Sequence, residues 1–141
     1  MSLPAVLLPL FVEVALTLVL GIWLAYLRGR DLGGGAVHPS KIAVREPNWP
    51  LQTQLVGNCF SNQFELPVLF YVLTILEVVT RHADLVFLIL AWVFVLTRIM
   101  HAAVHTTTNR IQFRGAWYGF GAVALLLAWV LYIVRVLFVL P

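Results

Sequence analysis

Long apolar runs, separated by short polar connections, dominate the pattern along the chain. Four runs stand out, and each is long enough to cross a bilayer, which takes about 20 residues. They cover roughly residues 4–27, 51–80, 84–108 and 116–140. A transmembrane strand would alternate apolar and polar residues, whereas the fourth run includes a stretch, 123–128, that is apolar on every face. The pattern predicts an all-α integral membrane protein, a bundle of four transmembrane helices.

The composition agrees with lipid as the solvent. Of the 141 residues, 62% are hydrophobic and 11% are charged, whereas a soluble domain carries roughly 25% charged residues. Four spans with short connections use nearly the whole length. We therefore expect one membrane domain over residues 1–141, in which the one long connection is a loop at about 28–50.

Basic residues gather in two of the connections and predict the orientation. They are Arg28, Arg30, Lys41 and Arg45 in the first connection, and Arg110 and Arg114 in the third. By the positive-inside rule, these two connections face the cytosol and both termini lie outside it. The bias accounts for the net charge of +3, so we expect membrane lipids and no nucleic acid as partners.

Some charged residues fall inside the predicted spans, where a charge is costly unless it faces protein or a partner. They are Glu13, Glu65, Glu77, Arg98 and Arg135. Glu77 precedes Arg81 by four residues, the favourable order for a helical ion pair. Arg135 lies about two turns from the outer end of its helix, where it can reach the interface or meet Glu13. These three charges have structural explanations.

The remaining two charges belong to rows of polar side chains. At about 100° per residue, each row falls within roughly 80° of one helix face. The rows are Gln54, Asn58, Asn62 and Glu65 on the second span, and Arg98, His101, His105 and Asn109 on the third. Both lie in the cytosolic half of the membrane, so they can face one another or a shared cavity. Pro67 is expected to kink the second helix beside Glu65.

Two interpretations of the rows involve no organic ligand. The polar side chains can join helices through hydrogen bonds, as they do in other membrane proteins. Alternatively, His101 and His105, four residues apart, can bind one metal ion with Glu65 as a third ligand. The adjacent Arg98 would repel a cation, so we expect no metal.

A third interpretation is an anion site. Arg98, Arg110 and Arg114, with imidazole donors nearby, can bind carboxylates or stabilise an anionic nucleophile. The sequence contains no evident nucleophile with its own acid and base. An enzyme of this kind would therefore borrow its nucleophile, and a thiol cofactor fits.

The four-helix plan, the segment from Asn62 to Pro67 and the spacing Arg98-x-x-His101-x-x-x-His105 resemble the MAPEG family, membrane-associated proteins in eicosanoid and glutathione metabolism. The resemblance covers nearly the whole chain. The spacing of Arg110, Arg114 and Tyr118 is similar to that of the microsomal prostaglandin E synthase branch. It implies a homotrimer that binds glutathione between subunits from the cytosolic side, with a lipophilic electrophile or hydroperoxide arriving from lipid. The expected glutathione-binding residues are Asn62, Glu65, Arg98, His101, His105, Arg110 and Tyr118. Arg114 would be the catalytic residue that stabilises the thiolate.

The sequence departs from that branch at three positions. Asn58 and Ser61 stand where the branch carries arginine, and His105 stands where it carries tyrosine. We expect a glutathione-dependent transferase or peroxidase. The alternative is a non-catalytic membrane trimer, or an accessory subunit of a larger membrane complex, that binds lipid or a partner. A metal or haem protein is a third hypothesis.

Overall fold

The structure is a computed structural model that describes residues 1–43 and 48–138; Arg45 and the predicted helical residues 139–140 lie outside these ranges. Within them, four helical spans are long and apolar enough to cross a membrane, which confirms the predicted all-α fold class. The elements are α1 (Leu3–Gly33), η1 (Pro39–Lys41), α2 (Leu51–Ser61), η2 (Asn62–Phe64), α3 (Leu66–Val79), α4 (Leu85–Thr106) and α5 (Ile111–Phe138).

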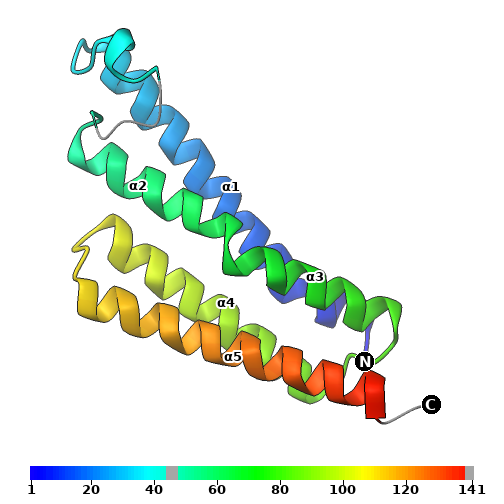
Figure 1. Cartoon of the computed structure of the whole chain (residues 1–141). Coiled ribbons are helices and arrows are strands. Elements are labelled where there is room, and N and C mark those ends of the chain that lie inside the picture. The colour runs from blue at the N-terminus through cyan, green and yellow to red at the C-terminus, as the bar shows by residue number, and fades with distance from the viewer. Residues whose placement is uncertain (44–47, 139–141) are drawn as a thin grey trace.

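The helices form two layers, one of α1 with α2 and α3, the other of α4 with α5 (Figure 1). The layers lie close together at the end of the bundle where α1 begins and α5 ends. They diverge toward the opposite end, which holds the α1–α2 and α4–α5 connections. This arrangement agrees with termini on one side of a membrane, while the side that faces the cytosol stays a prediction.

The helix α1 is longer than the apolar pattern predicts. The predicted span ends at residue 27, but the helix continues to Gly33. In the added turns Asp31 is buried and accepts hydrogen bonds from Arg30, at 2.8 Å, and from Thr53 of α2. The chain then leaves the helix through Gly35, whose φ of 70° favours glycine. Hydropathy misses these turns because they are polar and are held by a contact with another helix.

The second span is interrupted beside Glu65. The helix α2 ends at Ser61, the short η2 follows, and α3 begins at Leu66. Glu65 has φ −101° and ψ −106°, which are not helical values. Pro67 has no backbone N–H and cannot donate a hydrogen bond to the carbonyl of Gln63. It is accommodated in the first turn of α3, because backbone N–H groups in a first turn have no partner within the helix. The predicted kink is confirmed in position, and the helix is broken there.

The other predicted helix ends also shift. The helix α4 ends at Thr106, two residues before the predicted 108. The helix α5 begins at Ile111, five residues before the predicted 116, so Arg114 and Tyr118 lie on one continuous helix. The connection between the helices is correspondingly short and contains Asn109 with a left-handed φ of 47°.

Asp84 caps the N-terminus of α4. Its carboxylate accepts a hydrogen bond from the backbone N–H of Phe87 at 2.8 Å and another from Arg135 of α5 at 2.5 Å. Partial burial acts to raise the pKa of the Asp84 carboxyl, but these two donors outweigh it, and the pKa lies below its usual value. The pair joins the start of α4 to the last turns of α5.

Of the two roles expected for Arg135, the pairing with Glu13 is therefore wrong. Arg135 pairs with Asp84, whereas Glu13 lies deep in the bundle with Arg98, its Oε1 3.8 Å from the Arg98 Nε. Glu13 is ten residues into α1, too far from the outer end of α5 to be its partner.

The predicted ion pair between Glu77 and Arg81 is also absent from the described ranges. Glu77 is 1% exposed and its Oε2 has no hydrogen-bond partner there. The helix α3 ends at Val79, and Arg81 takes a left-handed φ of 59°. The i to i+4 geometry that would bring the two side chains together is lost because the helix stops between them.

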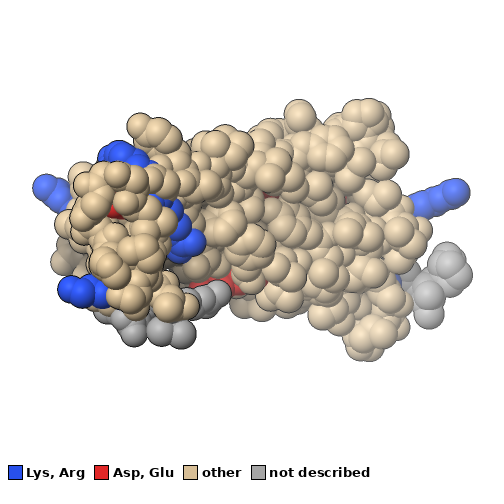
Figure 2. Space-filling model, turned by 90° about the horizontal axis from the view of Figure 1, so that it is seen from above, with Lys and Arg blue, Asp and Glu red and all other residues tan. Residues whose placement is uncertain are grey.

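Apolar contacts hold the two layers together. Phe70 of α3 stacks on Phe94 of α4 with ring centroids 4.8 Å apart. Cys59 is fully buried against Leu20 and Ala102 and acts as a small packing residue. On the face in Figure 2, Lys and Arg gather mainly at the two ends, and the middle is nearly free of charge. That distribution suits a bundle whose middle contacts lipid.

Candidate functional site

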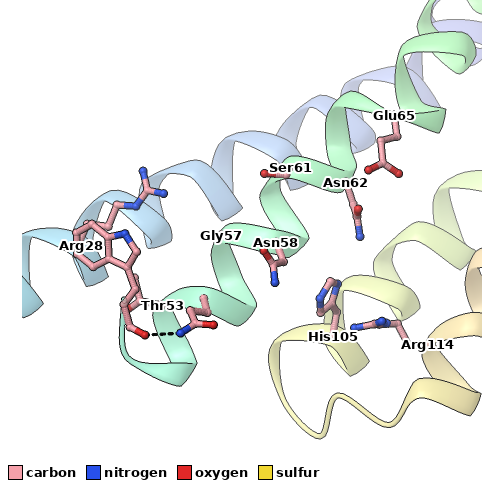
Figure 3. Close-up of a pocket in the computed structure, with 11 residues that line it drawn as sticks. Arg28, Thr53, Gly57, Asn58, Ser61, Asn62, Glu65, His105 and Arg114 are labelled. Atoms are coloured by element: carbon pink, nitrogen blue, oxygen red, sulfur yellow. Dashed lines mark hydrogen bonds between the residues drawn. The ribbon is translucent and has the colours of Figure 1, made fainter. Parts of the chain in front are cut away.

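A cavity of about 620 Å³ lies at the end of the bundle where the layers diverge (Figure 3). Its volume is within the roughly 300–1,000 Å³ typical of small-molecule sites. It is lined by Arg28, Trp49, Thr53, Gln54, Gly57, Asn58, Ser61, Asn62, Glu65, His105 and Arg114. The lining residues come from α1, the α1–α2 connection, α2, η2, Glu65 at the break, α4 and α5.

The first predicted polar row forms one wall. Gln54, Asn58, Asn62 and Glu65 all line the cavity, as their helical spacing predicts. In Figure 3, Asn58, Asn62 and Glu65 project toward the α4–α5 side. The break after Ser61 lets the row continue past the end of α2, because Glu65 follows the short η2 and still lines the same cavity.

His105 and Arg114 form the opposite wall. The Arg114 Nη1 donates to the Asn109 Oδ1 at 2.7 Å, so the turn between α4 and α5 orients the guanidinium. His105 is 3% exposed, and its Nδ1 has no hydrogen-bond partner in the described part of the chain. A cation and an imidazole nitrogen therefore meet at one place in the wall.

Three of the predicted binding residues lie behind this wall. The Nδ1 of His101 donates to the Arg114 carbonyl at 3.0 Å, because a carbonyl can only accept. The Tyr118 ring lies 5.6 Å from the His101 ring, and the Arg98 guanidinium lies 5.8 Å from the Tyr118 ring centroid. These side chains support Arg114 and Asn62 and do not line the cavity in this single chain.

Arg110 and Asn109 also lie outside the lining. Arg110 is exposed, and its carbonyl accepts the first helical hydrogen bond, at 2.9 Å, from the N–H of Arg114. Of the predicted site residues, Asn62, Glu65, His105 and Arg114 thus come together in the cavity. Of the second polar row, His105 alone belongs to the lining.

Part of the lining was not anticipated from the sequence. The Arg28 guanidinium stacks over the Trp49 ring at 5.3 Å, which holds the end of α1 against the residue that precedes α2. Thr53 is 1% exposed and donates to Asp31. Arg28 could have been placed in the site only if the first helix had been predicted to continue to residue 33. The polar residues after residue 27 do not indicate such a continuation.

The charged groups of the lining are two cations and one anion. Arg28 and Arg114 lie on different elements, and Glu65 is the carboxylate. Within the described ranges, the Glu65 carboxylate makes no ion pair. Those ranges also contain no group of three or more His, Cys, Asp or Glu side chains that could hold a metal ion. The lining suits an organic ligand that carries two negative groups and one positive group.

The fold and the site define a multi-pass helical membrane protein with a polar cavity at one end of its bundle. The MAPEG family model matches residues 6–140, nearly the whole chain. The chain therefore belongs to the MAPEG family, which confirms the resemblance found in the sequence. No curated protein and no solved structure matches the chain significantly.

Proposed function

We propose that the protein is a glutathione-dependent transferase or peroxidase that acts on lipophilic electrophiles or hydroperoxides. The observation that carries this proposal is the charge pattern of the cavity. Glutathione has two carboxylates and one ammonium group, and the lining offers Arg28, Arg114 and Glu65. The amides of Asn58 and Asn62 add neutral donors and acceptors for the peptide groups.

Bound glutathione would supply the thiol nucleophile. An ordinary thiol has a pKa of about 8.5, and lowering it below 7 takes about 2–3 kcal/mol, which one well-placed guanidinium can provide. Arg114 suits that role because Asn109 orients it within the wall. Asn62 and Glu65 would hold the peptide part of the tripeptide.

Family membership supports one further part of the proposal, and the distribution of basic residues supports another. The chain would assemble as a homotrimer whose subunits together enclose the site, and Arg98, His101, Arg110 and Tyr118 could gain ligand contacts there. The orientation predicted from basic residues makes the cavity open toward the cytosol, where glutathione is available. A lipophilic substrate would enter from the lipid beside the layers.

Isothermal titration of the detergent-solubilised protein with glutathione tests the proposal. We expect binding at millimolar concentration or below. Arg114→Ala should weaken it roughly 10- to 100-fold, because hydrogen bonds to charged groups contribute about 1.5–3 kcal/mol each. Arg81→Ala removes an exposed arginine that lies just after α3, beside the start of α1 and outside the cavity lining, and is the matched control. Binding weaker than millimolar in the wild type would contradict the proposal.

One observation favours a second candidate, a non-catalytic membrane trimer or accessory subunit that binds lipid or a partner. Asn58 and Ser61 line the cavity and are neutral where the similar branch has arginine. The cavity then offers fewer cations to two carboxylates. This candidate predicts no glutathione binding, and it predicts that Arg114→Ala leaves trimer stability and partner copurification unchanged in a native pull-down.

A further inference from the structure

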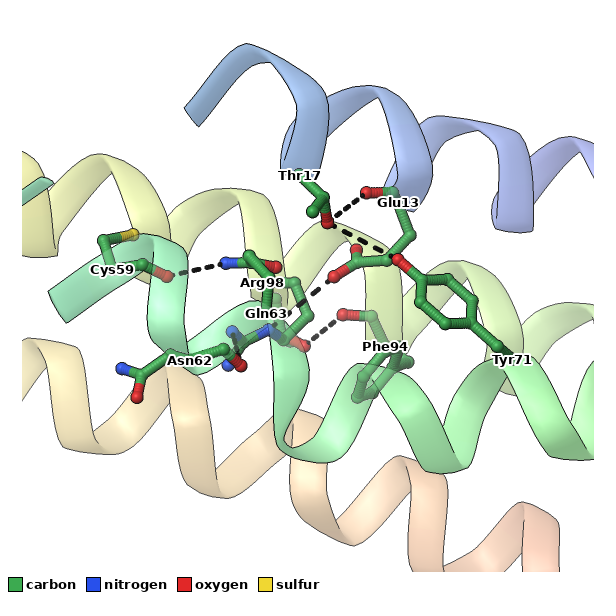
Figure 4. Close-up of polar contacts among 9 residues, drawn as sticks. Glu13, Thr17, Cys59, Asn62, Gln63, Tyr71, Phe94 and Arg98 are labelled. Atoms are coloured by element: carbon green, nitrogen blue, oxygen red, sulfur yellow. Dashed lines mark hydrogen bonds and ion pairs between the residues drawn. The ribbon is translucent and has the colours of Figure 1, made fainter. Parts of the chain in front are cut away.

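A buried ion pair lies in the middle of the bundle, behind the cavity. Glu13 of α1 is 0% exposed and Arg98 of α4 is 1% exposed, and the Glu13 Oε1 lies 3.8 Å from the Arg98 Nε (Figure 4). Neither oxygen of Glu13 makes a hydrogen bond in the described part of the chain. The Glu13 carboxylate is therefore stabilised mainly by the charge of Arg98.

Arg98 also binds the backbone where the second span is broken. Its Nη2 donates to the carbonyl of Asn62 at 3.1 Å. That carbonyl has left the regular helical ladder and otherwise receives a long 3.5 Å hydrogen bond from the N–H of Glu65. A freed carbonyl at membrane depth needs a partner, and Arg98 is that partner. The guanidinium thus fixes the short segment that presents Asn62 and Glu65 to the cavity.

Two acids compete for this one guanidinium. Of the carboxylates in the described ranges, Glu13 and Glu65 are within electrostatic reach of Arg98. Glu13 takes the ion pair, while Glu65 is exposed, lines the cavity and forms no ion pair in those ranges. A buried arginine attracts whichever carboxylate can reach it, because an unpaired buried charge is strongly unfavourable. Without Glu13, the acid left within reach of Arg98 would be Glu65.

We propose that Glu13 is a positioning residue that determines ligand specificity. As the internal counterion of Arg98, it keeps the Asn62 segment in place and leaves the Glu65 carboxylate available for a cationic group of the ligand. Glu13 itself lies outside the cavity lining, so it acts through Arg98. The identity of the ligand rests on the proposed function, and the cationic group is then the ammonium of glutathione.

The binding test compares glutathione with its deaminated analogue, in which hydrogen replaces the amino group. The wild type should prefer glutathione, and Glu65→Gln should lose that preference. Glu13→Gln should reduce the preference at least about tenfold, toward the Glu65→Gln value, because a hydrogen bond to a charged group is lost. Glu13→Asp keeps a carboxylate near Arg98 and should retain more of the preference than Glu13→Gln.

Glu77→Gln is the matched control, because Glu77 is also 1% exposed but lies in the last turn of α3, at the opposite end of the bundle from the cavity. It should keep the wild-type preference. If Glu13→Gln keeps the full preference while the wild type binds glutathione, the positioning role is overturned. A purely structural effect of Glu13→Gln would weaken the binding of both ligands and leave their ratio unchanged, so loss of the preference with the deaminated analogue still bound excludes it.

Hydrogen exchange of the unliganded protein separates this inference from the proposed function. Amides of residues 62–66 should exchange faster in Glu13→Gln than in the wild type, since Arg98 no longer holds the Asn62 carbonyl. Glu77→Gln should match the wild type in this segment. If the wild type fails to bind glutathione, the proposed function fails and this measurement alone decides the role of Glu13. Unchanged exchange in Glu13→Gln would then overturn it.

Discussion

Gly121 of α5 lies close against Thr97 of α4, and Gly121→Ala is expected to destabilise the protein. An added Cβ would lie 2.6 Å from the Thr97 Oγ1, well inside contact distance. Thr97 cannot easily move, because its hydroxyl donates to the Phe94 carbonyl at 2.6 Å. Overpacking of this kind costs about 1–3 kcal/mol, while replacing a helical glycine by alanine returns about 1 kcal/mol. The net loss should reach up to about 2 kcal/mol.

The assay is thermal or chemical unfolding in detergent, in two backgrounds. With Thr97→Ala already present, the clash is gone, and Gly121→Ala should instead stabilise by about 1 kcal/mol. Gly119→Ala on the same helix is the control, since its added Cβ meets nothing within 4 Å. If Gly121→Ala has the same effect in both backgrounds, the close contact with Thr97 is not the cause and the reasoning is refuted.

Three further predictions concern other parts of the bundle. The hydrogen bonds from Arg135 and the Phe87 N–H hold the pKa of Asp84 below its usual value, so the Asp84 charge stabilises the folded state above the unfolded pKa of about 3.9. This contribution is lost as the pH falls through the folded value, and Asp84→Asn should make the melting temperature less dependent on pH over that acidic range. Thr53→Val should lower the free energy of unfolding by about 1.5–3 kcal/mol, because Asp31 loses a donor, whereas Thr53→Ser should stay near the wild type. Cys59 is 0% exposed and should resist a membrane-permeant maleimide until the protein unfolds, while Ser61→Cys in a Cys59→Ser background should react in the folded state.

The spans themselves could be predicted because lipid imposes them. A helix that crosses the membrane must satisfy its own backbone and present apolar side chains, and both requirements are local. The position of the break followed from Pro67, whose missing N–H acts on its own helix. The C-terminal end of α1 and the start of α5 could not be predicted from hydropathy, because Arg28 and Arg114 lie on helical turns that are polar in sequence.

In the candidate site, too, only the features that depend on a single helix could be predicted from the sequence. Helical spacing predicted the row from Gln54 to Glu65, and all of it lines the cavity, although Glu65 reaches it across the break in the helix. Helical spacing did not predict which residue of the second row reaches the cavity. His105 lines it, whereas Arg98 and His101 point to the interior of the bundle. Arg28 joins the site through the packing of α1 beside α2, which no local pattern encodes.

The sequence by itself determined the membrane class, the four spans, the place of the break and one polar wall, since each depends on the residues of a single helix. The tertiary structure alone decided the partners of the buried charges. Glu13 meets Arg98 and Arg135 meets Asp84 because of how far each helix is shifted and rotated against its neighbours. That register comes from side-chain packing between helices, and it also leaves Glu65 facing the cavity.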